Sequence, residues 1–299
     1  MALHTTRRHR SARAVPARAA RKVGLYVVLT AFGVLFFLPF CVSVVDSLMM
    51  ASDILHFPPY LLPPRPTLQN YVVLITNVYP PDRQSPGLSI LRPLLNSIVV
   101  AVCYVIGSIF FCSLAGHAFA KYRFWGRDGL FSLLLATMLV PSGVGLIPNF
   151  IIMTRLRWVD TWLPLIVPGL SSAFGIFLMR QSMVSIPDDL IDAARMDGAG
   201  EFGTYWRVVV PVARPALGAL TIYMFLGNWN AFLAPLVYLT TRSRYTLPLF
   251  LSLLSGVARY TQYAEVLAAS VISTIPVLVT FLAMQRQFVT GITLGAVKE

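Results

Sequence analysis

Six long stretches of this sequence contain no aspartate, glutamate, lysine or arginine, and this pattern restricts the fold more than any other feature. They cover residues 23–45, 93–120, 129–154, 161–179, 215–241 and 266–285. A helix needs about 17–25 apolar residues to cross a bilayer, and each stretch meets that length. Charged residues make up only 12% of the chain, against about a quarter in soluble domains. The sequence therefore predicts an all-α membrane protein with six transmembrane helices.

The first stretch follows an arginine-rich leader, so a cleaved secretory signal peptide is the alternative to a membrane helix. A signal peptide has an apolar core of about 7–15 residues, followed by a cleavage site with small side chains. The run over 23–45 is longer, and Leu38, Pro39 and Phe40 precede Cys41, where a lipoprotein signal would need small residues. We expect an uncleaved first helix over residues 23–46.

Lysine and arginine are divided unevenly between the segments that connect these stretches. Alternate segments, beginning with the leader, carry sixteen of the 24 basic residues, and the others carry eight. Because short cytoplasmic loops collect Lys and Arg, we expect a multi-pass membrane protein with both termini in the cytoplasm. The net charge of +12 follows from this topology. No aromatic–basic motif indicates nucleic acid binding, and the leader is expected to lie near anionic membrane lipid.

These features divide the chain into consecutive parts. Residues 1–22 form a basic cytoplasmic tail, 23–46 the first transmembrane helix, and 47–92 an external loop whose prolines oppose regular helix except over 68–75. Residues 93–288 form the transmembrane core, with a polar cytoplasmic loop at 185–214, and 289–299 form a cytoplasmic C-terminal tail. In the second stretch, small residues at four-residue spacing are typical of a helix face packed closely on another helix. They are Ser108, Cys112, Gly116 and Ala120.

The polar loop carries eight charged side chains between residues 187 and 214. Each would cost about 2.5 kcal/mol or more at the bilayer centre, so we expect this loop in water. Ser185 and Asp188 have the spacing of a capping box for a first amphipathic helix, and Gly198 predicts its end. A second helix would begin at Glu201 and end at Pro211. Its residues Phe202, Tyr205, Trp206 and Val209 are expected to share one side.

The same loop carries a spaced pattern. Asp192-Ala193-Ala194 is followed after three residues by Gly198, and after nine more by Val208-x-Val210-Pro211. This string resembles the EAA motif of ABC-importer permeases, Glu-Ala-Ala-x3-Gly-x9-Ile-x-Leu-Pro, with conservative departures at 192, 208 and 210. Strings at 96–101, 119–124, 177–181, 186–187, 228–230 and 295–298 are also similar to the sugar-importer branch, and in particular to the shorter permease of the maltose system. The resemblance runs from the first stretch to the C-terminus.

The resemblance implies a type-I importer architecture in the inner (plasma) membrane of a bacterial cell. In that family a second homologous permease, two cytoplasmic ABC ATPase subunits and an extracytoplasmic solute-binding protein complete the transporter. The loop would be the helix that couples the ATPase to transport, through Asp192, Ala193, Ala194, Asp197, Gly198, Val208 and Pro211. Asp192 would face a basic residue of the ATPase, with a reach one methylene shorter than that of the family's glutamate, and Gly198 would permit the turn.

The chain has no sequence motif for catalysis of its own. Its three lysines lie in no Gly-x4-Gly-Lys-Ser/Thr loop, which nucleotide-binding P-loops require. No His-Glu-x-x-His pattern indicates a metal site. We therefore expect no enzyme activity, cofactor or metal in this subunit, and ATP hydrolysis in a partner.

Two amides and an indole stand inside the fifth stretch, at Asn228, Trp229 and Asn230. Polar groups in a membrane need partners, so these side chains should face the interior of the bundle. Amide hydrogen bonds and aromatic stacking suit a sugar on a translocation path. Contacts between helices are the alternative explanation.

The function predicted from the sequence is that of an importer permease that forms half of the path for a sugar or related small solute. One alternative is a permease for another solute, such as a glycerol-phosphate-like compound. Another is an ion-coupled secondary transporter, which usually has an ionisable residue within a span. The six stretches contain no Asp, Glu, Lys or Arg, which disfavours that class.

Overall fold

The computed structural model describes residues 14–54, 56–58, 60–76, 89–257 and 263–296, and within these ranges the chain is helical without a strand. The helices in chain order are α1 (Ala14–Ser47), α2 (Ala51–Ile54), α3 (Gln69–Thr76), α4 (Leu91–Lys121), α5 (Arg127–Thr137), α6 (Leu146–Arg155), α7 (Leu163–Ile166), α8 (Ala173–Val184), α9 (Asp188–Met196), α10 (Glu201–Thr204), α11 (Val210–Val212), α12 (Arg214–Trp229), α13 (Leu233–Tyr238), α14 (Leu247–Val257) and α15 (Tyr263–Ala296). Short 3-10 turns cover Ser142–Gly145, Val167–Gly169 and Arg242–Arg244, and a π-helical turn covers Tyr205–Val209.

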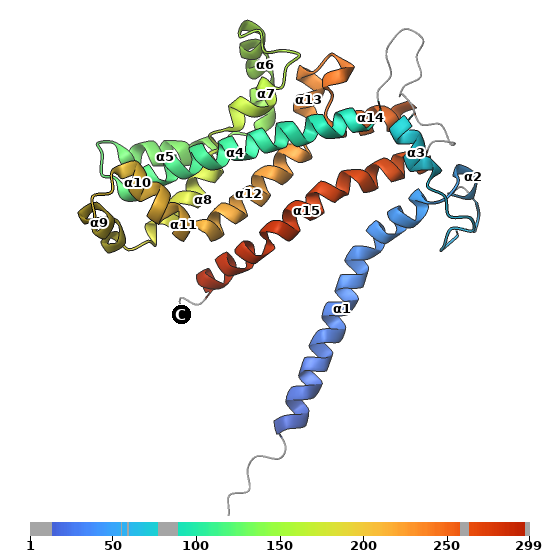
Figure 1. The fold of residues 1–299 in the computed structure, drawn as a ribbon, viewed down its shortest axis with the longest axis horizontal. Coiled ribbons are helices and arrows are strands. Elements are labelled where there is room, and N and C mark those ends of the chain that lie inside the picture. Colours follow the sequence, from blue (N-terminus) through green and yellow to red (C-terminus); the bar gives the residue numbers. More distant parts are fainter. Residues whose placement is uncertain (1–13, 55, 59, 77–88, 258–262, 297–299) are drawn as a thin grey trace, which may run out of the picture.

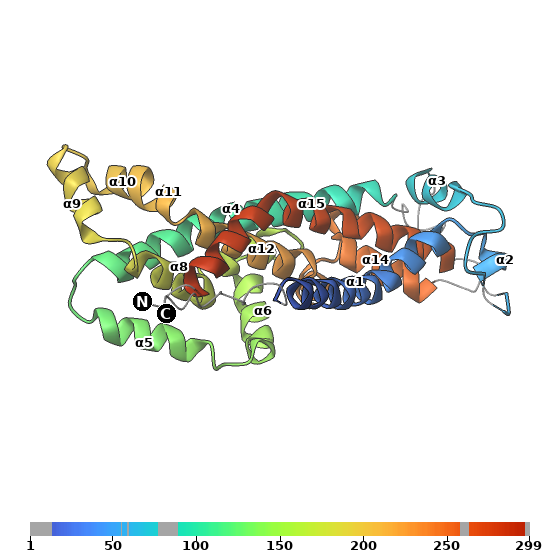
Figure 2. The same ribbon diagram turned by 90° about the horizontal axis from the view of Figure 1, so that it is seen from below.

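The described chain forms an elongated bundle. Figure 1 shows α4, α12 and α15 running along its long axis, with α1 diverging from α15 toward the N-terminus. The segment α9–α11 lies at one end, and α2, α3 and α14 lie at the other (Figures 1 and 2). Large apolar side chains of α1 are exposed, for example Phe36, which is 76% exposed. Such a surface fits lipid rather than water as its surroundings.

The prediction of an all-helical membrane protein is confirmed, with four to five candidate spans among the described residues. Four segments are long and apolar enough: Lys22–Ser47, Leu91–Lys121, Leu163–Val184 and Tyr263–Gln287. A fifth is present if Glu201–Val212 and α12, which meet at a bend of 80°, are taken as one span.

The expectation of one continuous helix is wrong for three of the six stretches. Residues 161–179 are divided between α7, the 3-10 turn at Val167–Gly169 and α8, although Leu163–Val184 remains one candidate span. Residues 129–154 are divided between α5 and α6, with Pro141 in an extended conformation (φ −60°, ψ 132°) between them. Residues 215–241 are divided at Trp229, where α12 ends before α13 begins. Pro148 and Pro235 lie in the first turns of α6 and α13, where a missing N–H costs no helical hydrogen bond. The prolines therefore favour new helices over continuation of the old ones.

The proline-rich region contains a short helix where its sequence allows one. α3 (Gln69–Thr76) matches the helix allowed at 68–75. Its Tyr71 hydroxyl lies 2.7 Å from the Ser47 hydroxyl, and Asn70 donates to the carbonyl oxygens of Ser47 and Met49 at 2.7 and 2.9 Å. These bonds fasten α3 to the end of α1. Residues 77–88 lie outside the described ranges.

The small-residue face of α4 packs closely on α8 and the chain before it, as predicted. A Cβ atom added to Gly116 would lie 2.6 Å from Met179 Cβ and 2.9 Å from the Arg180 backbone nitrogen. Ser108 Oγ donates to the Gly169 carbonyl oxygen at 3.0 Å, and Cys112 lies against Gly175. Close backbone approach and interhelical hydrogen bonds are what hold membrane helices together.

We expect Gly116→Val to destabilise the protein by ~3 kcal/mol, because the backbone of α8 cannot move aside as a flexible side chain could. Thermal unfolding of the detergent-solubilised protein measures the effect. Gly33→Val in α1 is the matched control, since an added Cβ there meets no atom within 4 Å. An equal fall in unfolding temperature for both variants would contradict the packing argument.

Candidate functional site

The polar loop predicted to couple the chain to a partner forms a projection at one end of the bundle. α9, α10 and α11 lie beyond the ends of the long helices in both ribbon views (Figures 1 and 2). Only Ile191 of α9 is buried. Asp188 and Asp189 lie in its first turn and Arg195 in its last, an order that suits the helix dipole.

The capping box predicted at the start of α9 is absent. Ser185 Oγ donates to the Ser182 carbonyl oxygen at 2.7 Å, within the preceding turn. Pro187 is the N-cap residue directly before α9, and no side chain caps the helix. Its fixed φ of −60° suits a helix start, so proline supplies the boundary that serine was expected to supply.

Gly198 forms the turn between the two halves of the projection, as the sequence predicted. Its φ is +82°, a left-handed conformation that costs other residues about 1–2 kcal/mol. Its N–H bonds the Arg195 carbonyl, and the Ala199 N–H bonds the Ala194 carbonyl, both at 3.0 Å. This pair of bonds is the Schellman motif. An added Cβ would meet nothing within 4 Å, so conformation rather than space requires glycine here.

The second half of the projection is not a regular amphipathic helix. Tyr205 and Val209 are buried, whereas Phe202 and Trp206 are 62% and 56% exposed and stack with ring centroids 6.5 Å apart. The expected clustering is confirmed for the three aromatic residues, since the Tyr205 ring lies 6.0 Å from Phe202 and 6.2 Å from Trp206, but only Tyr205 and Val209 are buried. A π-helical turn over Tyr205–Val209 holds more residues than an α-helical turn, so this half departs from regular α-helical geometry. The sequence signal for this irregular turn is Pro211, which has no backbone N–H to donate to the helical hydrogen bonds one turn later.

The coupling residues named from the motif lie along this projection. Asp192, Ala193, Asp197 and Gly198 are exposed, and Ala194, Val208 and Pro211 are half-buried. Arg195 pairs with Asp192 at 3.3 Å and with Glu201 at 3.1 Å, which joins α9 to α10 across the glycine turn. Tyr122 also donates its hydroxyl to Glu201.

Lys121, at the end of α4, holds the projection to the bundle. Its side chain is 7% exposed, and its Nζ lies 2.5 Å from the Ile186 carbonyl oxygen and 2.6 Å from Asp188 Oδ1. The hydrogen bond and charge of Lys121 lower the pKa of the Asp188 carboxyl. Sequence reasoning did not identify Lys121 or its partners, although the family-like string at 119–124 contains it.

The three polar residues of the fifth stretch do not act together. Trp229 is buried, and its Nε1 donates to the Ser273 carbonyl oxygen of α15 at 3.2 Å. Asn230 is exposed at the end of α12. Asn228 donates to the Leu165 carbonyl oxygen at 3.2 Å and lines a cavity of about 200 Å³ between α4, α7, α12 and α13. For Trp229, the alternative explanation therefore holds: its side chain joins two helices rather than lining a path.

The cavity beside Asn228 combines apolar walls with a few polar groups. Val100 and Tyr104 of α4 line it opposite Asn228, together with Thr246, whose buried hydroxyl has no hydrogen-bond partner among the described residues. Small-molecule sites have this combination. The described residues contain no group of three or more His, Cys, Asp or Glu side chains that could hold a metal.

We expect Lys121→Met to loosen the projection by about 2 kcal/mol, because the buried Ile186 carbonyl oxygen loses this donor. Faster amide hydrogen exchange in α9 is the measurement. The matched control is Arg127→Met, which breaks an ion pair with the adjacent, 77% exposed Asp128, a contact of little energetic weight. Unchanged exchange in Lys121→Met would show that Lys121 does not hold the projection.

Comparison with known proteins places this geometry in a family. Residues 108–293 match the family described as binding-protein-dependent transport system inner membrane component. The chain is 38% identical over 204 residues to the arabinooligosaccharides transport system permease protein AraQ of Bacillus subtilis, covering 68% of this chain and 72% of that protein. It is 35% identical over 203 residues to the lactose transport system permease protein LacG of Rhizobium radiobacter, covering 68% and 74%.

A further relative and a solved structure cover more of the chain. The sn-glycerol-3-phosphate transport system permease protein UgpE of Yersinia pestis is 32% identical over 268 residues, or 89% of this chain and 94% of that protein. A crystal structure of a bacterial ABC transporter involved in alginate import has a chain with the same fold, at a TM-score of 0.77 and 24% identity, covering 93% of this chain and 99% of that one. With the family match spanning more than half of its length, the chain belongs to the inner membrane components of binding-protein-dependent transport systems and is an ABC importer permease whose ATP hydrolysis takes place in a separate subunit.

Proposed function

We propose that this permease imports a sugar or oligosaccharide and that the α9–α11 projection docks on the ATPase. The observation that carries the docking proposal is the left-handed Gly198 turn, which holds two short helices at a fixed angle outside the bundle. A stiff projection can pass a push from a motor subunit to the long helices, whereas a flexible loop cannot. Met196, Phe202 and Trp206 are exposed on it and offer the apolar and aromatic surface that interface centres favour.

The direction of the chain in the membrane follows from its basic residues. Sixteen of the 24 lysines and arginines lie in alternate connecting segments, one of which contains α9–α11, and this supports a cytoplasmic position for the projection and both termini. Joining α5 to α6 as one interrupted crossing, and counting α12 as another, gives the six crossings expected from the sequence. Interrupted helices are tolerated in membranes where they are buried in protein or line a cavity.

The complete importer is proposed to contain a second permease, two ATPase subunits and an external solute-binding protein. Relatives named for arabinooligosaccharides and lactose favour a sugar over the alternative, a glycerol-phosphate-like solute, although UgpE aligns over more of the chain. The cavity beside Asn228 supports a neutral polar solute, because its polar lining consists of amide and hydroxyl groups without a charged side chain.

Uptake by the reconstituted complex tests this function. Proteoliposomes that hold the permease with its cognate partners are supplied with labelled arabinotriose, lactose or sn-glycerol 3-phosphate, and ATP-dependent accumulation is measured. We expect a sugar to accumulate and Gly198→Arg to abolish uptake while the protein still inserts. Gly198→Ala should reduce uptake about tenfold because of its left-handed φ.

Gly200→Ala is the matched control, since Gly200 has open space but an ordinary φ of −70°. Normal uptake by Gly198→Arg would refute the coupling role of the turn. Accumulation of glycerol 3-phosphate alone would refute the sugar assignment but leave the coupling role intact.

For the path, we expect Asn228→Ala to raise the KM for the transported sugar about fivefold, the effect of one lost hydrogen bond. The ATPase activity stimulated by the binding protein should stay unchanged. Asn230→Ala, an exposed amide that does not line the cavity, serves as the control. Equal KM values for the two variants would contradict a solute contact at Asn228.

A further inference from the structure

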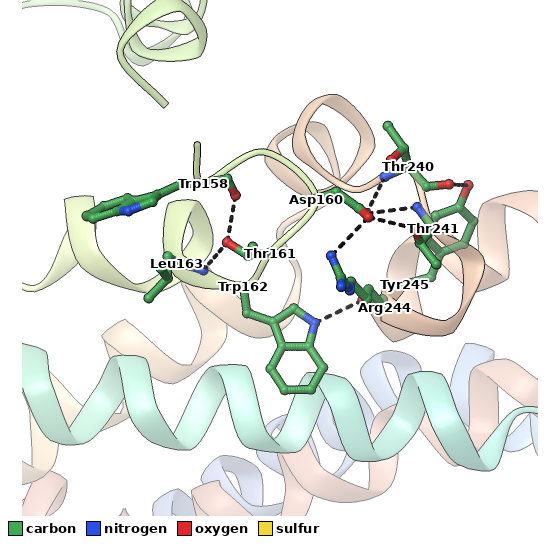
Figure 3. A network of polar contacts seen from close by, with 9 residues as sticks. All are labelled: Trp158, Asp160, Thr161, Trp162, Leu163, Thr240, Thr241, Arg244 and Tyr245. Carbon is green, nitrogen blue, oxygen red and sulfur yellow. Dashed lines mark hydrogen bonds and ion pairs between the residues drawn. The ribbon is translucent and has the colours of Figure 1, made fainter. Parts of the chain in front are cut away.

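A cluster centred on Asp160 joins two connecting segments beside α4. Its carboxylate accepts hydrogen bonds from the Thr240 and Thr241 backbone N–H groups (3.0 and 2.8 Å), from the Thr241 hydroxyl (2.6 Å) and from Arg244 Nη1 (2.9 Å), as Figure 3 shows. Trp162 Nε1 adds a bond to the Arg244 carbonyl oxygen at 3.1 Å. The φ of Asp160 is +60°, a costly conformation that these bonds offset.

The Asp160 carboxylate is ionised at neutral pH. Desolvation alone would raise the pKa of Asp160, but the hydrogen bonds from Thr241 and Thr240 and the charge of Arg244 bring it to about 2. The cluster, defined as Asp160, Thr240, Thr241 and Arg244, is therefore held by charge-assisted bonds, which are stronger than neutral ones.

The Asp160 cluster is fastened to the first turns of α4. Asn96 Nδ2 donates to the carbonyl oxygens of Ser243 and Tyr245, both at 2.9 Å. The Leu247 N–H donates to Ser97 Oγ at 2.7 Å. Asn96 and Ser97 are only 6% and 5% exposed, so these bonds are shielded from water.

The opposite end of α4 is fastened to the α9–α11 projection in a similar way. The hydroxyl groups of Ser113 and Tyr205 lie 2.7 Å apart and are buried. Because Ser113 Oγ donates to the Ile109 carbonyl oxygen, Tyr205 is the donor between the two hydroxyls. Lys121 and Tyr122 add the bonds to Asp188 and Glu201 described above.

The helix that carries both attachments, α4, is uninterrupted over its 31 residues and about 46 Å long. Its only proline, Pro93, lies in the first turn, whereas α1 and α15 contain Pro39 and Pro276 in their interiors. A helix without an interior proline resists the bending that Pro introduces. α4 is thus a straight connection between the projection and the Asp160 cluster.

We infer that Tyr205 and Asp160 are positioning residues of the transport cycle, which tie the two ends of α4 so that the projection and the Asp160 cluster move as one body. This inference rests on the proposed coupling role of α9–α11. It assigns the transmission of the ATPase movement to α4, through Ser113–Tyr205 at one end and Asn96, Ser97 and the Asp160 cluster at the other. Neither residue touches the solute in this account.

The test measures ATP hydrolysis by the reconstituted complex with and without the cognate binding protein, loaded with whichever of the three solutes the uptake assay selects. Tyr205→Phe should lower the stimulation by the binding protein about fivefold, the effect of one hydrogen bond. Asp160→Asn, which loses charge-assisted bonds, should lower it about tenfold. Unstimulated hydrolysis should stay within about twofold of wild type in both variants, which a mere folding defect would not produce.

The double variant Tyr205→Phe/Asp160→Asn separates one pathway from two. If both residues act through α4, the double variant should lose no more stimulation than Asp160→Asn alone, whereas independent effects would multiply to about fiftyfold. A multiplicative loss, or full stimulation in either single variant, overturns the inference. Should Tyr205→Phe fail to assemble, Ser113→Ala takes its place, because it removes the other partner of the Ser113–Tyr205 hydrogen bond.

Two matched controls remove the same chemical groups elsewhere. Tyr223→Phe alters a half-exposed tyrosine of α12, and Asp128→Asn alters an exposed aspartate of α5. Both should keep wild-type stimulation. The inference is also overturned if Tyr223→Phe loses as much stimulation as Tyr205→Phe, or Asp128→Asn as much as Asp160→Asn. A wild-type complex without stimulation would instead refute the proposed function, so the two failures are distinguishable.

Discussion

The close contact between α4 and α8 is the interaction on which the rest of the bundle depends. Gly116 lets the helices approach until an added Cβ would overlap Met179, and the Ser108 hydroxyl bonds the backbone just before α8. In lipid, burial of apolar surface between helices contributes little, so such packing and hydrogen bonding must hold the bundle. Because α8 leads directly into α9 and α4 ends at Lys121, the same contact also fixes where the projection begins.

The long helices differ in the prolines and bends that their backbones contain. α4 has no interior proline, α15 contains Pro276, and α12 meets the chain before it at 80°. A proline or a bend frees backbone groups that neighbouring helices must satisfy, which makes those places the ones where a bundle can change shape. The cavity beside Asn228 lies between α4 and the interrupted segments α7, α12 and α13, where a change of shape would alter it most.

Local rules predicted the helical class and the Gly198 turn but not the way α9 begins, and contacts between residues distant in the sequence were not predicted. The helical class followed from the charge-free stretches, and the Gly198 turn from a backbone requirement that only neighbouring residues set. The break at Pro141 was missed because apolar composition measures affinity for lipid rather than helical continuity. The bond from Lys121 to Ile186 joins residues 65 positions apart, and the Asp160 cluster joins residues 80 to 84 positions apart. No periodicity or motif in one sequence indicates such pairs.

Asp188, Asp192, Arg195 and Glu201 of the projection already have charged partners within the chain, and this limits how a second protein can bind it. Arg195 pairs with both Asp192 and Glu201, so a basic residue of the ATPase that approached Asp192 would compete with Arg195. Exchange of one exposed ion pair for another yields little free energy. Burial of Met196, Phe202 and Trp206 yields more, because these side chains are between 56% and 88% exposed and apolar burial contributes about 25 cal/mol per Å². Affinity should therefore come mainly from the apolar side chains, while the Asp192–Arg195–Glu201 bonds keep the projection in the shape that presents them.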